Sequence, residues 1–430
     1  MSTQQQPAPT RLDEGSPTRA PAERGRASTL ERRIVASFLR RLGDLPVRFR
    51  LWDGTEIADP ARRSRFEVRI ADRGTLWRLV ANPELAFGDA YAAGRLEVGG
   101  DLVALLEHVN RARPPGRFPR AASALLNRPT RRNSRRGSRD NIHHHYDLGN
   151  DFYSLWLDRE LLYTCAYYPR EDLSLEEAQR AKMEHVCRKL RLEPGQRVVE
   201  AGSGWGALAL YMARNYGVTV RSYNISERQV GLARERVRRE GLADRVEYVH
   251  DDYRTIEGRY DVFVSVGMLE HVGPQYLEEL GRLIARCLEP DGVGLVHTIG
   301  RDSPRRLNAW IERRIFPGAS PPTLRRMMEI FEPNGLSVLD VENLRLHYAL
   351  TLREWLRRFE QHAQEVEERF DERFVRAWRL YLSGSIAAFR AGSLQLFQVL
   401  FQRAGSNRVA MSRRHLYVPE LAPPRAAPAG

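Results

Sequence analysis

Cysteine is scarce in this sequence, and long apolar runs are missing from it. The 430 residues include three cysteines, Cys165, Cys187 and Cys287, whose wide spacing fits neither a disulfide framework nor a zinc site. No run approaches the roughly 18 apolar residues that a membrane-spanning helix needs. The first residues also lack the apolar core of a secretory signal. These absences predict a cytoplasmic protein in a reducing compartment.

Positive charge is abundant but unevenly placed. The formal net charge is +13, and residues 111–140 hold ten arginines and a single acid. Interleaved proline, serine and asparagine predict that this segment is an exposed basic linker. Such a linker could be a solvated spacer, or it could bind an anionic surface. Binding to an anionic phospholipid surface would be favoured by roughly 1 kcal/mol per arginine close to it. Binding to nucleic acid would be favoured through its phosphates. Charge alone does not distinguish the spacer, the lipid surface and the nucleic acid.

Composition divides the chain into five parts. Residues 1–28 are rich in Pro, Gln, Ser and Arg and predict a disordered tail. Residues 29–110 predict a small α+β domain, in which alternating residues 47–52 meet the hairpin signal Asp53-Gly54. The basic linker follows at 111–140, a larger domain at 141–415, and a Pro/Ala-rich tail at 416–430.

Helices and strands alternate regularly in the larger domain. Ser174 and Glu177 form a capping box that predicts a helix to residue 190. Five strands are predicted at residues 197–201, 218–223, 246–249, 260–265 and 293–299, with a turn at 290–292. This alternation predicts an α/β fold with a largely parallel, doubly wound sheet. Beyond it we expect an amphipathic helix over 352–370 and a second long helix from 374 to about 401.

A glycine loop, Gly202-Ser203-Gly204-Trp205-Gly206, stands between a predicted strand and a helix. This arrangement predicts a nucleotide-type ligand, because glycines let the backbone turn sharply and approach it closely. A dinucleotide site expects an acid at the end of the second strand, where Asn224 stands here. The turn at residues 250–253 is well placed to bracket an adenine. Adenosylmethionine is favoured, and a dinucleotide or another ligand stays open.

Several longer motifs resemble the cyclopropane-fatty-acid synthase family, which includes the mycolic acid cyclopropane synthases. They are residues 145–153 (HYDLGNDFY), 163–167 (YTCAY), 266–273 (VGMLEHVG), 295–300 (LVHTIG), 315–318 (IFPG) and 394–399 (LQLFQV). The likeness spans roughly residues 141–403 and extends loosely into the N-terminal domain. It implies the class I S-adenosylmethionine (SAM) methyltransferase fold, a Rossmann-like doubly wound sheet with helical insertions.

The resemblance also implies an activity: transfer of a methylene group from SAM to the cis double bond of unsaturated phospholipid acyl chains. In this family the base that closes the cyclopropane ring is thought to be a bound bicarbonate. Matching positions for the catalytic set are Cys165, Glu270, His297, the backbone of Ile299, and Tyr348. Donors around a small anion beside Glu270 could come from His297, Tyr348 and main-chain N–H groups.

By the same matching, a second set of positions is expected to bind SAM: Tyr146, Thr164, Gly202, Gly204, Gly206, Asn224, Ile225, Gln229, Asp252 and Tyr253. Ser203, Ala207, Ala201 and Asn224 depart from the family's usual residues, which points to a divergent branch. No metal site is expected, because the adjacent histidines 143–145 cannot readily face one ion.

The expected partner is an anionic membrane surface, reached by peripheral association with the inner face and aided by the N-terminal domain and the basic linker. A homodimer is possible. A related activity would transfer the methyl group without closing the ring and give a methyl-branched or methylene product. A nucleic-acid methyltransferase is the remaining alternative, although the tetrapeptides typical of base methylation are missing from the sequence.

Overall fold

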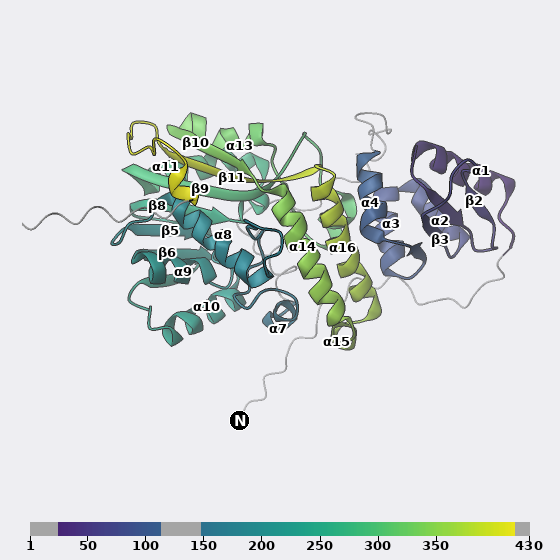
Figure 1. Ribbon diagram of the computed structural model, residues 1–430, viewed down its shortest axis with the longest axis horizontal. Helices are drawn as coiled ribbons and strands as arrows, with labels where there is room; N and C mark the ends of the chain where they lie inside the picture. The colour runs from purple at the N-terminus through teal and green to yellow at the C-terminus, as the bar shows by residue number, and fades with distance from the viewer. Residues whose placement is uncertain (1–24, 113–147, 418–430) are drawn as a thin grey trace, which may run out of the picture.

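The computed structural model of the protein describes residues 25–112 and 148–417 (Figure 1). Tyr146, the histidines at 143–145, nearly all of the basic linker and most of both predicted tails lie outside the described residues. Within the described part of the chain, no helix is long and apolar enough to cross a membrane.

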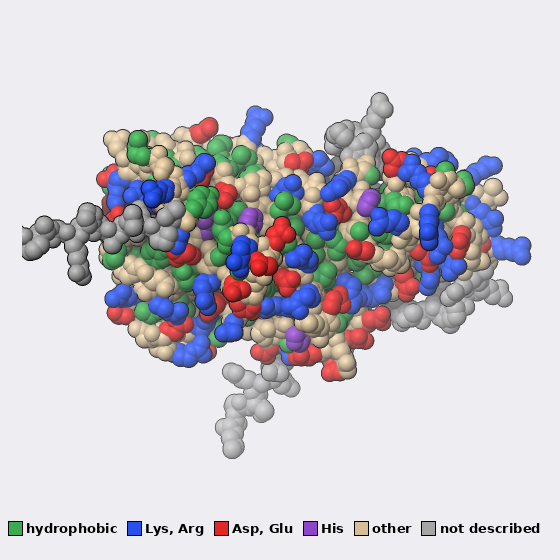
Figure 2. All heavy atoms as spheres, in the orientation of Figure 1, with side chains coloured by type: hydrophobic (Ala, Val, Ile, Leu, Met, Phe, Trp, Pro, Cys, Tyr) green, Lys and Arg blue, Asp and Glu red, His purple; other side chains and the backbone are tan. Residues whose placement is uncertain are grey.

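The N-terminal region folds around a small mixed sheet with strand order β2-β1-β3-β4. The predicted hairpin is confirmed, because β1 pairs antiparallel with β2 across Asp53-Gly54. The elements are α1 (Thr29–Arg41), β1 (Val47–Arg50), β2 (Glu56–Ala58), β3 (Phe66–Ile70), α2 (Arg73–Ala81), α3 (Pro83–Ala92), β4 (Leu96–Gly99) and α4 (Leu102–Arg111). In Figure 2, Lys and Arg side chains gather over this end of the molecule.

The ordered region begins a few residues before the predicted boundary at residue 29. Ala27 is buried, and its N–H donates to Asp53 Oδ2 at 2.7 Å. The indole N–H of Trp52 donates to the carbonyl of Gly25 at 2.8 Å. Two polar groups of the hairpin therefore fix residues 25–28, which composition alone assigns to the tail.

The larger region is built on a seven-stranded sheet with order β10-β11-β9-β8-β5-β6-β7. Strands β9, β8, β5, β6 and β7 are parallel to their neighbours in that part of the sheet, which confirms the predicted doubly wound α/β architecture. β11 runs antiparallel between β9 and β10. The strands are β5 (Arg197–Ala201), β6 (Thr219–Asn224), β7 (Val246–His250), β8 (Tyr260–Val266), β9 (Leu288–Arg301), β10 (Leu336–Asn343) and β11 (Leu394–Arg403).

Helices cover this sheet and join it to the N-terminal region. They are α7 (Asn150–Ser154), α8 (Leu175–Leu190), α9 (Ala207–Tyr216), α10 (Glu227–Arg239), α11 (Leu277–Cys287), α12 (Ala309–Arg314), α13 (Leu324–Phe331), α14 (Arg345–Gln361), α15 (Ala363–Arg369), α16 (Glu372–Arg390) and α17 (Arg414–Tyr417). Short 3-10 turns occur at η1 (Tyr253–Thr255), η2 (Leu269–His271), η3 (Pro274–Tyr276) and η4 (Glu332–Asn334). The capping box predicted at Ser174 and Glu177 is confirmed at the start of α8.

Helices α14 and α16 lie between the large sheet and the N-terminal region (Figure 1). Arg376 of α16 donates to the carbonyls of Tyr91 and Leu96 at 2.6 and 3.2 Å. Arg314 of α12 forms a two-point ion pair with Asp89 of α3. Apolar side chains from both regions form one continuous core, so the two sheets are coupled through these helices.

The prediction of one long helix from 374 to about 401 is wrong at its C-terminal end. α16 stops at Arg390, and residues 394–403 form strand β11. Ser393 and Gly392, which has φ +79°, separate the two elements. Strand β10 was not predicted from the sequence. Both strands complete the sheet beside β9, and pairing across the sheet outweighs local helical spacing here.

The predicted turn at 290–292 is also wrong. Pro290, Asp291 and Gly292 lie within β9, which runs unbroken from Leu288 to Arg301. The register against β8 jumps at this point, since Tyr260 faces Leu288 whereas Val262 faces Val293. The extra residues of β9 form a bulge. Proline, aspartate and glycine next to one another are also typical of a turn, so the sequence alone does not distinguish the two.

Candidate active site

The glycine loop lies between β5 and α9, at the carboxyl end of the central strand. Gly206 has φ +89°, and a Cβ there would come within 2.5 Å of the Tyr248 hydroxyl. That hydroxyl donates to the Gly206 carbonyl at 2.7 Å. Glycine is therefore required at 206 both for its conformation and for the space that Tyr248 occupies.

A cavity of about 140 Å³ opens over this loop, along the carboxyl ends of β5, β6 and β8. Eight of the residues expected to bind SAM line it: Thr164, Gly202, Gly204, Asn224, Ile225, Gln229, Asp252 and Tyr253. Gly206 does not line the cavity and supports the loop from below. Parallel α/β sheets bind ligands at this edge, where the strand order reverses.

Asn224 organises one wall of the cavity. Its side-chain amide donates to Ser203 Oγ at 3.1 Å, to the Gly204 carbonyl at 3.2 Å and to Gln229 Oε1 at 2.8 Å. Its Oδ1 accepts the N–H of Ser226 at 3.0 Å. The residue that replaces the expected acid therefore ties the glycine loop to the start of α10.

The turn after β7 forms the opposite wall. Asp252 accepts from Arg254 at 2.9 Å, and both side chains are 5% exposed. The Arg254 guanidinium also lies over the rings of Tyr253 and Tyr276, at 4.9 and 5.0 Å from their centroids. Burial raises the pKa of the Tyr253 hydroxyl, against the opposing effect of the Arg254 guanidinium, and the proton of this hydroxyl has no acceptor among the described residues. It is a neutral donor available to a ligand in the cavity.

Two buried charged residues at the cavity were not predicted from the sequence. Lys182 of α8 donates to Thr164 Oγ1 at 3.0 Å, and Glu200 of β5 accepts from Ser222 Oγ at 2.5 Å. Burial lowers the pKa of Lys182 to about 8 and raises that of Glu200 to about 7. Glu200 could have been singled out from the sequence, because it stands inside an apolar strand next to the glycine loop, and an acid is rarely buried in such a strand without a partner. Lys182 carried no such signal, because a lysine is ordinary in an amphipathic helix.

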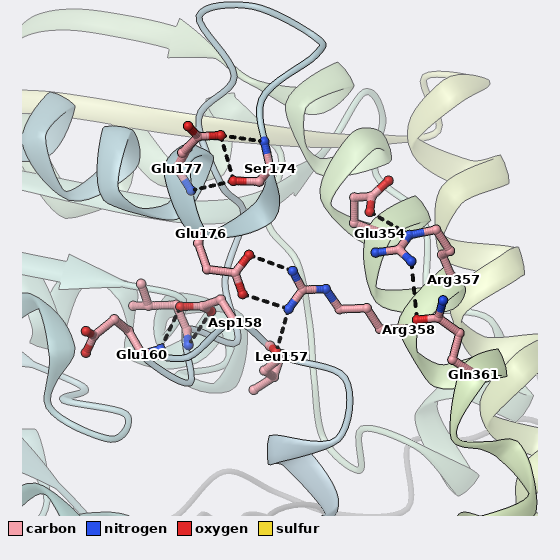
Figure 3. Close-up of polar contacts among 11 residues, drawn as sticks. Leu157, Asp158, Glu160, Ser174, Glu176, Glu177, Glu354, Arg357, Arg358 and Gln361 are labelled. Carbon is pink, nitrogen blue, oxygen red and sulfur yellow. Dashed lines mark hydrogen bonds and ion pairs between the residues drawn. The ribbon is translucent and has the colours of Figure 1, made fainter.

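The loop before the cavity is held by α8 and α14 (Figure 3). Arg358 forms a two-point ion pair with Glu176 at 2.9 and 2.6 Å and donates to the Leu157 carbonyl at 3.0 Å. The buried carboxylate of Asp158 accepts the N–H groups of Glu160 and Leu162, each at 2.9 Å.

The same loop contains a strained residue. Leu161 has φ +58°, a conformation that costs a branched residue free energy unless the surroundings enforce it. Gln179 of α8 donates to the carbonyls of Leu162 and Thr164 at 3.2 and 2.9 Å. The loop therefore carries Tyr163 and Thr164 to the cavity wall in a fixed conformation.

Glu270 and Ile299 meet next to the cavity. Glu270 follows β8 on the turn that contains the cavity-lining residues Met268 and His271. Its Oε1 accepts the N–H of Ile299 at 2.5 Å, and its Oε2 has no partner among the described residues. Burial raises the pKa of Glu270 to about 7. The Thr298 hydroxyl also acts on this carboxyl and opposes the rise in its pKa. One carboxyl oxygen is thus fixed to β9, and the other has no hydrogen-bond partner among the described residues.

His297 lies two residues before Ile299 on β9. The His297 ring is 1% exposed, and burial lowers its pKa to about 3. Its Nδ1 lies 3.0 Å from Nε2 of Gln398, and its Nε2 has no partner among the described residues. No role was predicted for Gln398, although it falls inside the family motif at residues 394–399.

Cys165 and Tyr348 both contact the carbonyl of Leu344, the residue before α14. Cys165 is buried with its thiol toward the carbonyls of Ala166 and Leu344, at 3.1 and 3.9 Å, and burial raises the pKa of this thiol. Tyr348 begins the second turn of α14, and its N–H donates to the same Leu344 carbonyl. The Leu344 N–H in turn donates to Leu396, which lies opposite Ile299. Hydrogen bonds therefore link the neighbourhoods of Cys165, Tyr348 and Ile299.

Comparison with protein families finds two matches. Residues 133–399 match the family described as mycolic acid cyclopropane synthetase, and residues 34–114 match a domain of unknown function, DUF7884. A probable fatty acid methyltransferase of Pseudomonas putida is 34% identical over 374 residues, which cover 83% of this chain and 91% of that protein. The cyclopropane-fatty-acyl-phospholipid synthase of Escherichia coli K12 is 41% identical over 270 residues, covering 63% of this chain and 69% of that one.

Solved structures give the same picture. The crystal structure of mycolic acid cyclopropane synthase CmaA1 complexed with SAH and CTAB is 30% identical, with a TM-score of 0.59. The match covers 61% of this chain and 98% of that one. The residues that match the family model, 133–399, include the cavity-lining residues and Glu270.

Proposed function

The chain belongs to the mycolic acid cyclopropane synthetase family of SAM-dependent lipid methyltransferases, and we propose that it converts the cis double bond of unsaturated phospholipid acyl chains into a cyclopropane ring. One observation carries the proposal. Two buried polar atoms of the expected catalytic set have no partner among the described residues: Glu270 Oε2, on the turn that lines the cavity, and His297 Nε2, on β9 two residues before the Ile299 N–H that binds Glu270.

SAM fits the cavity by the chemistry of its walls. The glycine loop lets main chain approach the ligand, Tyr253 offers a neutral hydroxyl, and Asn224 holds both the loop and Gln229. SAM would supply the methyl group. In the proposed reaction an alkene carbon bonds to this methyl as the sulfur–methyl bond breaks, which leaves SAH and a cation on the neighbouring acyl carbon. Loss of a proton from the new methyl group then closes the ring.

The Glu270 neighbourhood fits a small anion. A bound bicarbonate would supply the base for the last proton transfer. Because burial raises the pKa of Glu270 to about 7, its carboxyl is partly protonated and partly ionised near neutral pH, so Oε2 can both donate a proton to an anion and take one up from it. A glutamine amide at this position can donate a hydrogen bond but cannot take up a proton. His297 is neutral and can donate from Nε2. Preorganised donors in a water-poor site hold an anion at no reorganisation cost, and a base so placed typically contributes about 10²–10⁴-fold.

Aromatic side chains next to the cavity suit both the acyl chain and the cationic intermediate. Tyr163 lines the cavity, lies 5.2 Å from the ring of Trp355 and shares a hydrogen bond with Tyr381 at 2.8 Å. These rings belong to the apolar core that continues into α14 and α16. A ring face close to a cation stabilises it by roughly 0.5–2 kcal/mol.

The N-terminal domain, with the basic linker, is proposed to dock the enzyme on the cytoplasmic face of an anionic membrane. Three large apolar side chains of α1 and α2 are exposed, Leu30 at 60%, Trp77 at 41% and Val80 at 37%. Helices α1 and α2 lie at the end of the molecule where basic side chains gather (Figures 1 and 2). Exposed apolar groups with arginines nearby favour an anionic bilayer surface.

A second activity is supported by the similarity to the probable fatty acid methyltransferase. In that case the methyl group is transferred and the ring does not close. The same cavity would bind SAM, and the difference would lie in the fate of the cation.

Mass spectrometry of total fatty acids tests these proposals. A host rich in monounsaturated phospholipid would express the wild type, Glu270→Gln, or the matched control Glu278→Gln at an exposed site of α11. We expect wild type and control to add one CH₂ to the acyl chains with loss of the alkene, and NMR to show the ring, whereas Glu270→Gln makes much less. The same mass gain without the ring supports methyl transfer alone. No modified lipid at all, with SAM binding intact, contradicts both.

A further inference from the structure

A row of polar side chains crosses three neighbouring strands at one level of the main sheet. Gln398 of β11 lies opposite His297 of β9 on one side and opposite Glu342 of β10 on the other. Residues directly opposite each other on paired strands project to the same face. Gln398 and His297 are 0% and 1% exposed, so their polar atoms need partners inside the protein.

The outer end of the row is held by α8. The Glu342 carboxylate accepts from His185 Nε2 at 2.7 Å and from Lys189 Nζ at 2.6 Å. Although burial raises the pKa of Glu342, these two partners lower it to about 2, so the carboxylate stays ionised and paired. Helix α8 therefore satisfies Glu342, and the amide of Gln398 is left for His297.

The contact between Gln398 and His297 determines where the histidine carries its proton. An amide nitrogen is a donor and never an acceptor, so at 3.0 Å Gln398 Nε2 donates to His297 Nδ1, while Gln398 Oε1 is buried without a partner among the described residues. The amide turned the other way would place Oε1 against Nδ1 and the ring proton on Nδ1, and the tautomer measurement below separates the two orientations. A neutral imidazole has one proton, and with Nδ1 accepting, that proton is on Nε2. Nε2 is the ring atom without a partner among the described residues. The ring thus presents a donor, in fixed orientation, two residues from the Ile299 N–H that binds Glu270.

We propose that Gln398 is a positioning residue: it holds His297 as the Nε2–H tautomer, so that His297 donates a hydrogen bond to the anion bound beside Glu270. This proposal rests on the proposed function, because the anion is the base of the ring-closing step. Gln398 itself touches neither the acyl chain nor SAM. Its effect passes through the ring of His297, in the way that a partner on the far nitrogen orients a histidine ligand.

Loss of the Gln398 amide has a selective consequence. With an apolar side chain at 398, His297 Nδ1 loses its donor, and the proton can reside on either ring nitrogen. In the Nδ1–H form Nε2 turns from donor to acceptor and repels an anion. Binding of the anion then weakens, whereas the cavity residues that bind SAM, such as Asn224 and Tyr253, are untouched.

Gln398→Met is the test variant, since it keeps the length of the side chain and removes the amide. Gln402→Met is the matched control. Gln402 is also a buried glutamine of β11, but its amide donates to the Ser406 carbonyl at 2.7 Å and its neighbour on β9 is Val293. Both full-length variants would be compared with wild type for SAM affinity by calorimetry and for dependence of ring formation on added bicarbonate in CO₂-depleted buffer.

The tautomer is measured separately, without turnover. Protein labelled with ¹⁵N in the histidine rings gives two-bond ¹H–¹⁵N correlations that show which ring nitrogen carries the proton, and the His297 signals are assigned by their loss in His297→Asn. We expect Nε2–H in the wild type and in Gln402→Met, and a mixture or Nδ1–H in Gln398→Met. We also expect the bicarbonate concentration for half-maximal rate to rise at least tenfold in Gln398→Met, with SAM affinity changed less than twofold.

Two results would overturn the positioning role. One is a wild-type His297 that carries its proton on Nδ1. The other is a Gln398→Met protein whose tautomer and bicarbonate dependence both match the wild type. If the wild type itself shows no bicarbonate dependence, the proposed function fails, and the tautomer still decides the role of Gln398. If Gln398→Met does not fold, the wild-type spectrum alone tests the proposal, because it shows whether His297 carries its proton on Nε2 or on Nδ1.

Discussion

Glu270→Gln should stabilise the fold while removing activity, and its effect should depend on pH. The folded environment raises the pKa of Glu270 to about 7 by burial, from an ordinary value of 4.5. Between these two values the unfolded chain has released the proton and the folded chain retains it. The stability of the wild type therefore falls as the pH rises through this window and levels off above about 7.

The size of the effect follows from the two pKa values. The separation of the two pKa values lowers the free energy of unfolding of the wild type by about 3 kcal/mol at pH 8 and by about 1 kcal/mol at pH 5.5. Glutamine carries no charge, and its Oε1 can still accept the Ile299 N–H, so the variant avoids this cost. Glu270→Gln should thus exceed the wild type in stability by about 2 kcal/mol more at pH 8 than at pH 5.5.

Thermal unfolding at the two pH values checks this in the protein without SAM or lipid. Other titrating groups, including Glu200, contribute equally to both proteins and cancel in the difference. Glu278→Gln, at an exposed site, should show no such growth with pH. The reasoning would be refuted if the stability gained by Glu270→Gln over the wild type were the same at pH 5.5 and pH 8. It would also be refuted if this gain became smaller as the pH rises.

Three further outcomes are expected. Gly206→Ala should weaken SAM binding at least tenfold by calorimetry and lower the melting temperature, because residue 206 has positive φ and the added methyl meets Tyr248. The control Gly231→Ala in α10, where the space around the residue is open, should leave stability unchanged or raise it slightly. Arg376→Met should speed hydrogen exchange in α3 and β4, since it removes both bonds to the N-terminal domain and the contact with the Tyr91 ring. The three cysteines should resist a thiol reagent at pH 8 until the chain unfolds, because each is buried and its thiol pKa is raised.

The sequence predicted the parallel half of the sheet well, because its strands are short apolar runs that alternate with helical segments along the chain. Ser174, for example, caps α8 as expected. The antiparallel half was predicted poorly. Residues 394–403 match a helix in local spacing, and only pairing with β9, about 100 residues earlier in the chain, makes them a strand. Sequence separation of that size leaves no local signal.

The family resemblance is confirmed, and with it the class I methyltransferase fold. Eight expected SAM positions line one cavity, which a glycine loop alone could not have shown. The roles of Glu270, His297, Cys165 and Tyr348 remain predictions. What the motifs could not reveal was the state of these groups: the raised pKa of Glu270 and the tautomer of His297 depend on burial and on a partner from another strand.

The position of β11 between β9 and β10 has a consequence for biosynthesis. β9 has left the ribosome long before residues 394–403 are made, so its outer edge has no partner during that interval. Over this time His297 also lacks Gln398. The nascent chain can complete its parallel strands early, but the sheet closes and the histidine acquires its neighbour when the last strand inserts. A chaperone that shields β9 during translation would protect a strand edge that waits about 90 residues of synthesis for its partner.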